Sequence, residues 1–180
     1  MGEVARTLVS LSGPDSVHGI IPEALVRYER DPNYTSSTQE ATTNGDAPSK
    51  LAIPEENIFG RTTVVKDMHT RKRMMAQEVI AGGPGSGFIA LSGGYGTIEE
   101  LFETTTWNQL GIHTRGICVL NINGFYDGIF EWINKSLKEG FVREGNGEIL
   151  VQATTAEEAV KLLRDYRVSS SVLKLAWGNE

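Results

Sequence analysis

The feature that most constrains the fold is the stretch 91–100, Leu-Ser-Gly-Gly-Tyr-Gly-Thr-Ile-Glu-Glu, which separates two different apolar patterns. The continuous apolar run 88–91 precedes its glycines and predicts a buried strand. Apolar residues at helical spacing follow from Ile98 and predict a helix. A glycine-rich turn between strand and helix places several backbone N–H groups at the positive end of the helix. The stretch is therefore a candidate anion site, with the carboxylate of Glu100 within one helical turn.

The rest of the chain repeats this alternation of strands and helices. Strands are predicted at 17–22, 61–65, 88–91, 117–122 and 149–151, and helices at 2–12, 67–81, 97–110, 126–138 and 155–166. This order predicts an α/β fold with a mostly parallel sheet flanked by helices. Ligands bind at the carboxyl ends of the strands in such sheets, so the turn at 92–97 and the start of the helix at 67 are expected neighbours.

The length of 180 residues suits one domain, 1–180. Residues 31–50 contain almost no large apolar side chains, and they cannot bury enough surface to offset the entropy of ordering. We therefore expect a flexible insertion at about 31–50. The tail from 168 has no clear period, although its apolar residues could dock on a neighbouring element.

The charge distribution favours a small anionic ligand. The formal net charge is −6, which argues against broad binding of nucleic acid or of an anionic membrane. Positive charge is nevertheless concentrated within thirteen positions, at Arg61, Lys66, Arg71, Lys72 and Arg73. A small basic patch on an acidic protein fits a phosphorylated small molecule better than a polymer.

The single cysteine and the hydropathy pattern bear on the compartment. Cys118 lies in the apolar run 116–120, where packing is the usual role of a cysteine, and no intrachain disulfide can form. No segment has the roughly 18 uninterrupted apolar residues of a membrane span, and no secretory signal opens the chain. We expect a cytoplasmic protein without a membrane partner.

The helix predicted from 67 carries two cations in an unusual place. Asp67 is its expected N-cap. The spacing puts Arg71 and Lys72 on the same inward stripe as Met68 and Met75, where a cation is costly without a partner or a ligand. The alternative is that both cations lie at the edge of the stripe and extend to water or to structural carboxylates. Spacing alone leaves both interpretations open.

The glycine-rich turn also has a purely structural interpretation. Residues 97–100 match a capping box, in which Thr97 caps the helix and Glu100 folds back to the amide of Thr97. A Glu100 that caps its own helix is not available to a ligand, so the two interpretations compete. Three glycines within positions 93–96 exceed what a plain turn needs, which favours the anion site.

Other common chemistries lack their residues. The sequence contains neither a GxxxxGK[ST] phosphate loop nor a GxGxxG dinucleotide motif. Ser86 lacks the flanking glycines of a nucleophile elbow, and no Ser-His-Asp triad can be placed. The three histidines are too far apart for metal-ligand spacing, and no lysine is singled out for a Schiff base. We expect neither a metal nor an organic cofactor.

Two separated motifs resemble the paired signature of the LONELY GUY family, whose members are often misnamed lysine decarboxylases. They are Met-His-Thr-Arg-Lys at 68–72 and Ser-Gly-Gly-Tyr-Gly-Thr-Ile-Glu-Glu at 92–100. The likeness continues through 19–23, 107–113 and 120–127. Family members are Rossmann-like cytokinin riboside 5′-monophosphate phosphoribohydrolases. They hydrolyse the N-glycosidic bond of the nucleotide to a free N6-modified adenine and ribose 5-phosphate, and they form homodimers or higher homo-oligomers.

The resemblance also implies roles for individual residues. Arg71 matches the family's catalytic arginine and Glu100 its catalytic glutamate. The remaining matched positions imply substrate binding, with the 5′-phosphate on the turn: Met68, Lys72, Gly93, Gly94, Tyr95, Gly96 and Thr97. Glu100 would contact the ribose and stabilise the cationic sugar or orient water, and Arg71 would steady the phosphate or the leaving base.

The chain departs from the family pattern in three places. Ser92 stands where the family usually has proline, and 82–87 looks like a surface insertion. Residues 1–2, Met-Gly, match a pair that family members have after their first two strands. The resemblance therefore implies a chain without the family's N-terminal strands, either as a fragment or with another segment in their place. The alternative functions are a non-catalytic nucleotide-binding relative and an inactive truncated paralogue.

Overall fold

The computed structural model describes residues 2–26, 53–175 and 177, and the chain divides into two compact units, Met1–Met75 and Ala76–Glu180. The insertion expected at about 31–50 lies outside the described residues. All strand pairs in the described residues are parallel, and helices cover the strands, which confirms the α/β fold class. Among these residues no helix combines the length and the apolar character that crossing a membrane requires.

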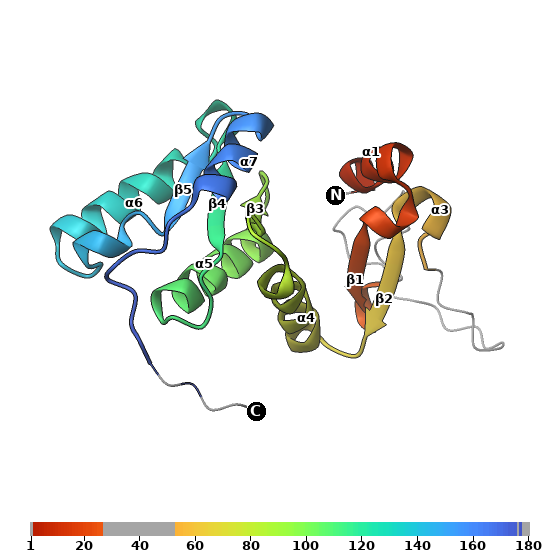
Figure 1. Ribbon diagram of the computed structural model, residues 1–180, viewed down its shortest axis with the longest axis horizontal. Coiled ribbons are helices and arrows are strands. Elements are labelled where there is room, and N and C mark those ends of the chain that lie inside the picture. Colours follow the sequence, from red (N-terminus) through yellow and green to blue (C-terminus); the bar gives the residue numbers. More distant parts are fainter. Residues whose placement is uncertain (1, 27–52, 176, 178–180) are drawn as a thin grey trace, which may run out of the picture. The chain divides into compact units, whose positions relative to one another are not determined.

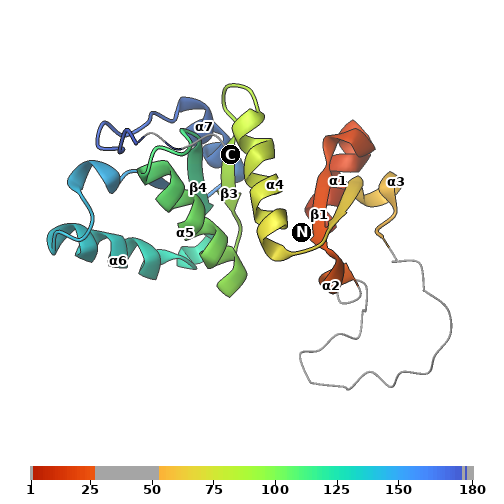
Figure 2. The same cartoon turned by 90° about the horizontal axis from the view of Figure 1, so that it is seen from below.

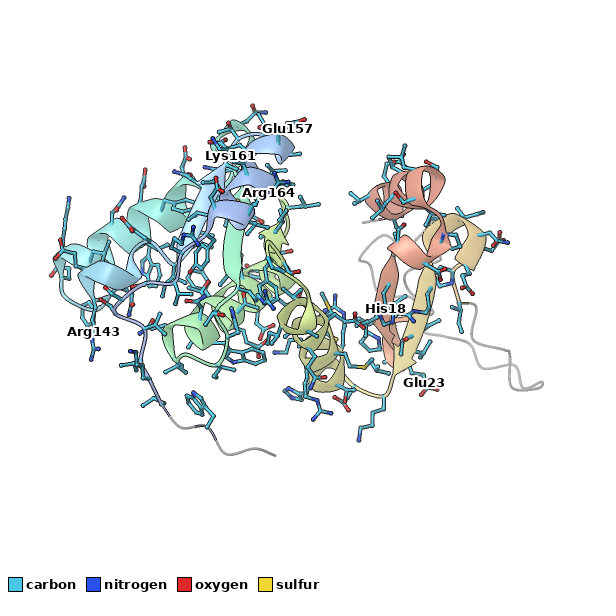
Figure 3. All side chains as sticks on the ribbon, in the orientation of Figure 1. His18, Glu23, Arg143, Glu157, Lys161 and Arg164 are labelled. Carbon is cyan, nitrogen blue, oxygen red and sulfur yellow. The ribbon has the colours of Figure 1, made fainter. Side chains whose placement is uncertain are left out.

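The first unit is built on a two-stranded sheet (Figure 1). β1 (His18–Pro22) pairs in parallel with β2 (Arg61–Val65), and Ile20 lies opposite Thr63. The ring of His18, labelled in Figure 3, joins the strands through a 2.8 Å hydrogen bond between its Nε2 and Oγ1 of Thr63. The other elements here are α1 (Gly2–Ser12), η1 (Pro14–Ser16), α2 (Glu23–Val26), α3 (Glu56–Phe59) and the first part of α4 (Met68–Ala81).

The second unit is built on a three-stranded parallel sheet in the order β3-β4-β5. Its strands are β3 (Gly87–Ala90), β4 (Gly116–Leu120) and β5 (Leu150–Ala153). Its helices are α5 (Tyr95–Gln109), η2 (Ile122–Gly124), α6 (Asp127–Lys138), η3 (Glu144–Asn146) and α7 (Ala156–Asp165). The predicted order of strands and helices is thus confirmed, with boundaries shifted by at most two residues.

Alternation along β4 produces three layers in this unit (Figure 2). Ile117 and Val119 point to one face, where they form a core with Leu101 of α5 and with apolar residues of α6. Cys118 points to the other face and packs with Ala159 and Leu163 of α7, which confirms its structural role. Burial raises the pKa of the Cys118 thiol to about 11, so the thiol stays protonated and unreactive at neutral pH.

β3 is less buried than its apolar sequence predicts, whereas the tail docks as expected. The run 88–91 predicts a buried strand, but β3 is only half-buried and the Ile89 side chain is 42% exposed. The reason is that β3 is an edge strand within the described residues, because it pairs only with β4. The tail does dock, since the indole N–H of Trp177 donates to the carbonyl of Leu110 at 3.1 Å.

Candidate functional site

The amino end of α5 is an open helix terminus at the carboxyl end of β3. The first intrahelical bond of α5 runs from the N–H of Ile98 to the carbonyl of Gly94, at 3.1 Å. The N–H groups of Tyr95, Gly96 and Thr97 precede that bond, so no carbonyl of the helix accepts from them. These amides and the positive end of the helix dipole together favour an anion.

The glycines of this turn differ in what the fold demands of them. A Cβ atom on Gly93 would collide with the side chain of Thr97, so Gly93 is required for packing. A Cβ atom on Gly94 or Gly96 would meet nothing within 4 Å, and neither residue has a positive φ. The fold therefore leaves open space beside both positions. Glycine there leaves room for a ligand to approach the backbone closely.

The structure corrects the capping prediction. Gly94 is the N-cap of α5, without a side-chain cap, and Thr97 lies at the third helical position. Thr97 therefore does not cap the helix, and the proposed capping box is wrong. The capping interpretation failed because the spacing of residues 97–100 could not show that the helix begins two residues before Thr97.

Tyr95 and Glu100 lie on the first two turns of the same helix. The side chain of Tyr95 is 97% exposed, whereas Glu100 is half-buried. Together with Gly93, Gly94, Gly96 and Thr97 they form one continuous group within the second unit. A carboxylate one turn from an anion-binding terminus suits a ligand that is negative at one end and positive at its reacting centre.

The first turn of α4 is held by two sets of hydrogen bonds within the first unit. Asp67 caps the helix as predicted, since its Oδ1 accepts from the N–H of Thr70 at 2.8 Å and its Oδ2 from the Thr70 hydroxyl at 3.0 Å. The bond from the Thr70 N–H is the main reason why the pKa of Asp67 is lowered. The Nε of Arg71 donates to the carbonyl of Ile20 on β1 at 3.2 Å, so β1 helps to orient the guanidinium.

The apolar stripe predicted on α4 is wrong at its first member. Met68 is 42% exposed, and Ala76 is the only residue of this helix that is fully buried. Arg71 and Lys72 are both half-buried, which fits the alternative interpretation that they lie at the edge of the stripe. The helix is only weakly amphipathic, so spacing alone was a poor guide to its inward side.

The predicted site residues thus fall into two groups. Residues 93–97 and Glu100 lie together in the second unit, and Met68, Arg71 and Lys72 lie together at the start of α4 in the first. The structure establishes the local geometry of each group.

Two residues near the turn had no assigned role in the sequence. The Tyr126 hydroxyl donates to the carbonyl of Leu91 at 2.7 Å, and the Asn121 side chain holds the backbone N–H of Tyr126, also at 2.7 Å. The stretch 120–127 stood out in the sequence through its family likeness. No local pattern connected it to residue 91, because the contact spans 35 positions.

His113 is a buried structural histidine with a defined proton position. Its Nδ1 accepts from the N–H of Arg115 at 3.1 Å, so its Nε2 carries the proton and donates to the carbonyl of Thr104 at 2.9 Å. Burial is the main cause of its lowered pKa. Protonation would place a second N–H against the N–H of Arg115.

We expect His113 to make the protein less stable in mild acid. The unfolded chain takes up a proton near pH 6.5 while the folded ring, with its lowered pKa, stays neutral. This contribution is complete above pH 6.5 and is lost as the pH falls toward the lowered pKa. Urea unfolding between pH 8 and pH 5 measures it. The His113→Gln variant keeps an amide donor but does not titrate, so its free energy of unfolding should fall less steeply with decreasing pH than that of the wild type. Parallel pH dependences of the two proteins would contradict the assignment.

A family model described as "Possible lysine decarboxylase" matches residues 1–163 of this chain. A cytokinin riboside 5′-monophosphate phosphoribohydrolase of Arabidopsis thaliana, LOG4, is 42% identical over 133 residues, which are 71% of this chain and 59% of that protein. The chain belongs to the LONELY GUY family. The family match includes every residue of the candidate site.

Two further proteins are similar to this LONELY GUY chain. A bifunctional cytokinin biosynthesis protein of Fusarium pseudograminearum is 52% identical over 177 residues, which are 98% of this chain but only 34% of that protein. A probable cytokinin riboside 5′-monophosphate phosphoribohydrolase of rice, LOGL1, is 36% identical over 166 residues, 92% of this chain and 60% of that protein. The chain therefore spans about a third of the fungal relative and three fifths of the plant relatives.

Proposed function

We propose that this chain hydrolyses the N-glycosidic bond of cytokinin riboside 5′-monophosphates, or more broadly of AMP-like nucleotides. The products are a free N6-modified adenine and ribose 5-phosphate. Membership of the LONELY GUY family and the activities for which its relatives are named support this reaction class. The observation that carries it in this chain is the open amino end of α5, where Gly94 and Gly96 leave space that the fold does not use.

In the proposed step, a water oxygen forms a bond to C1′ of the ribose while the bond from C1′ to the base nitrogen breaks. The electron pair of the broken bond leaves with the base, which takes up a proton. Positive charge develops on the sugar, as in glycoside hydrolysis. The Glu100 carboxylate would stabilise this charge or orient the water. Electrostatic placement of this kind is usually the largest catalytic contribution.

The substrate 5′-phosphate would lie at the amino end of α5. The amides of residues 93–97 would donate to its oxygens, and the side chain of Tyr95 is fully available to cover the ligand. This placement accounts for glycine at positions 94 and 96, because a Cβ atom there would displace a phosphate oxygen rather than a protein atom.

The family resemblance also assigns roles to three residues of α4. Arg71, oriented by the carbonyl of Ile20, would steady the phosphate or the leaving base, and Lys72 and Met68 would contact the substrate. We also propose that residues 1–180 form a single domain and that the chain assembles as a homodimer or a higher homo-oligomer. Light scattering of the full chain would measure the assembly.

The direct test is an assay of base release. Purified chain is incubated with isopentenyladenosine 5′-monophosphate, with AMP and with isopentenyladenosine, and the free base is separated by chromatography. We expect release from the monophosphates and little from the unphosphorylated riboside, because the phosphate supplies the binding energy at α5. Binding of the monophosphate without base release would instead support a non-catalytic relative. The absence of both binding and base release would overturn the proposal.

Substitution of Gly96 by Ala should separate stability from ligand binding. Gly96 is the second residue of α5, so alanine should leave stability unchanged or raise it by up to about 1 kcal/mol. The added methyl group should nevertheless weaken binding of ribose 5-phosphate by about tenfold or more, because it occupies the phosphate approach. Thermal unfolding and isothermal titration measure the two effects.

Gly128→Ala is the matched control for this substitution. Gly128 is the second residue of α6, and a Cβ there also meets nothing within 4 Å. It should therefore gain similar stability without losing affinity for ribose 5-phosphate. Equal affinity of the Gly96→Ala protein and the wild type for ribose 5-phosphate would show that the phosphate does not bind at this helix terminus.

A further inference from the structure

The carbonyl of Leu91 is held by a side chain from a distant part of the chain. The hydroxyl of Tyr126 donates to it at 2.7 Å, and the Tyr126 side chain is 3% exposed. Leu91 follows the last residue of β3 and lies two positions before Gly93. The bond is therefore made at the point where the regular strand gives way to the glycine-rich turn.

Tyr126 is itself fixed from several directions. Its N–H donates to Oδ1 of Asn121 at 2.7 Å, and its ring packs edge-to-face on Phe125 with centroids 4.8 Å apart. The Nδ2 of Asn121 donates to Oδ1 of Asp127 at 2.8 Å and to Oε1 of Gln152 at 3.0 Å. Asn121 is 5% exposed, and all its side-chain hydrogen-bonding groups are used. The Tyr126 hydroxyl thus has one defined position relative to the sheet.

A turn of this composition needs such a support. Residues 92–96 include three glycines, and each flexible backbone residue costs about 1–2 kcal/mol to order. Amides that must point together at an anion bind it well only when that cost is met before the anion arrives. A hydrogen bond to the carbonyl of Leu91 fixes the peptide plane that leads into the turn.

We propose that Tyr126 is a positioning residue, whose hydroxyl orients the amides of residues 93–97 toward the substrate phosphate through the carbonyl of Leu91. This inference rests on the proposed function, since the anion concerned is the 5′-phosphate. Asn121 acts one step further back by fixing Tyr126. Tyr126 itself does not touch the substrate.

Tyr126→Phe tests this role because it removes only the hydroxyl and keeps the packed ring. The phosphate is bound equally before and during the reaction, so KM for isopentenyladenosine 5′-monophosphate should rise about tenfold while kcat changes less than about twofold. The dissociation constant of ribose 5-phosphate should rise by the same factor, and inhibition by free adenine should not change. When saturating ribose 5-phosphate is bound to the full chain, hydrogen exchange of amides 92–97 should be faster in the variant than in the wild type.

Tyr166→Phe is the matched control. Tyr166 is half-buried, and it contacts Gly116 at the amino end of β4, which is the opposite end of the parallel strands from the turn. Its variant should leave KM, ribose 5-phosphate binding and exchange at 92–97 unchanged. A loss of active protein alone would lower the apparent kcat in either variant without moving KM.

The outcomes distinguish this inference from the proposed function. A wild-type chain that releases base, with a Tyr126→Phe variant of unchanged KM and unchanged exchange, overturns the positioning role alone. A chain that releases no base but binds ribose 5-phosphate, more weakly after Tyr126→Phe, supports the positioning role and overturns the proposed reaction. A wild-type chain that binds neither ribose 5-phosphate nor inorganic phosphate overturns both.

Discussion

Glu100→Gln is expected to lower kcat for base release by about a thousandfold while the protein stays folded. The substitution keeps the shape of the side chain and removes its negative charge. A carboxylate about 4 Å from a developing unit positive charge contributes about 4 kcal/mol at the effective dielectric constant of a protein site. Losing that contribution corresponds to about three powers of ten in rate. Single-turnover measurement of free base at saturating nucleotide reports the effect directly.

Glu99→Gln is the control for this variant. Glu99 is the preceding residue on α5 and is exposed, so its substitution removes the same charge from the same helix turn. Any general effect of charge on the helix dipole, about 0.3–1 kcal/mol, is therefore present in both variants. The Glu99 variant should keep a kcat within about threefold of the wild type. A Glu100 variant with a kcat as high as that of its control would exclude Glu100 from catalysis.

Arg71→Ala is expected to lower kcat/KM by about a hundredfold to a thousandfold, as does the loss of one well-placed charged donor in other enzymes. It should also cost up to about 1–3 kcal/mol of stability, because the carbonyl of Ile20 loses one hydrogen bond at a partly buried position. Kinetics must therefore be measured well below the unfolding temperature, which thermal denaturation of each variant gives.

Two further variants separate the role of Arg71 from general effects of charge. Arg73→Ala removes an exposed cation of the same helix and should leave kcat/KM nearly unchanged. Arg71→Lys keeps the charge but cannot donate in the planar two-pronged geometry of a guanidinium, so it should recover little activity. Full activity of the Arg71→Lys variant would show that Arg71 contributes only its charge. Equal losses of kcat/KM in the Arg71→Ala and Arg73→Ala proteins would show that Arg71 has no specific role in the site.

The elements with strong local signals were predicted well from the sequence. Gly13, Gly111 and Gly140 follow helices α1, α5 and α6 and have the positive φ that only glycine adopts easily. The apolar run at 116–120 became the central strand of its sheet, because it is apolar at every position. The Asp67 cap was also predictable, because an N-cap side chain bonds to a backbone N–H within three residues of itself.

The errors arose where local pattern and tertiary environment disagree. Thr97 matched a capping box, but α5 begins at Tyr95, and no side chain caps the helix at its N-cap residue Gly94. Met68 matched an apolar stripe, but burial of a helix face depends on what packs against it and not on spacing alone. Ile89 is apolar and exposed because it lies on a strand with one paired edge in the described residues.

The sequence by itself determined the α/β class and the order of its elements, and it predicted the anion site that we propose at the turn 91–100. These depend on period, glycine spacing and the dipole of one helix, which are local properties of the chain. Tertiary structure alone decided which glycines the fold requires and which it leaves open. It also decided that the hydroxyl of Tyr126 donates to the carbonyl of Leu91, 35 positions away. The physical reason is that steric contact and hydrogen bonding depend on distance in space, which spacing along the chain does not encode.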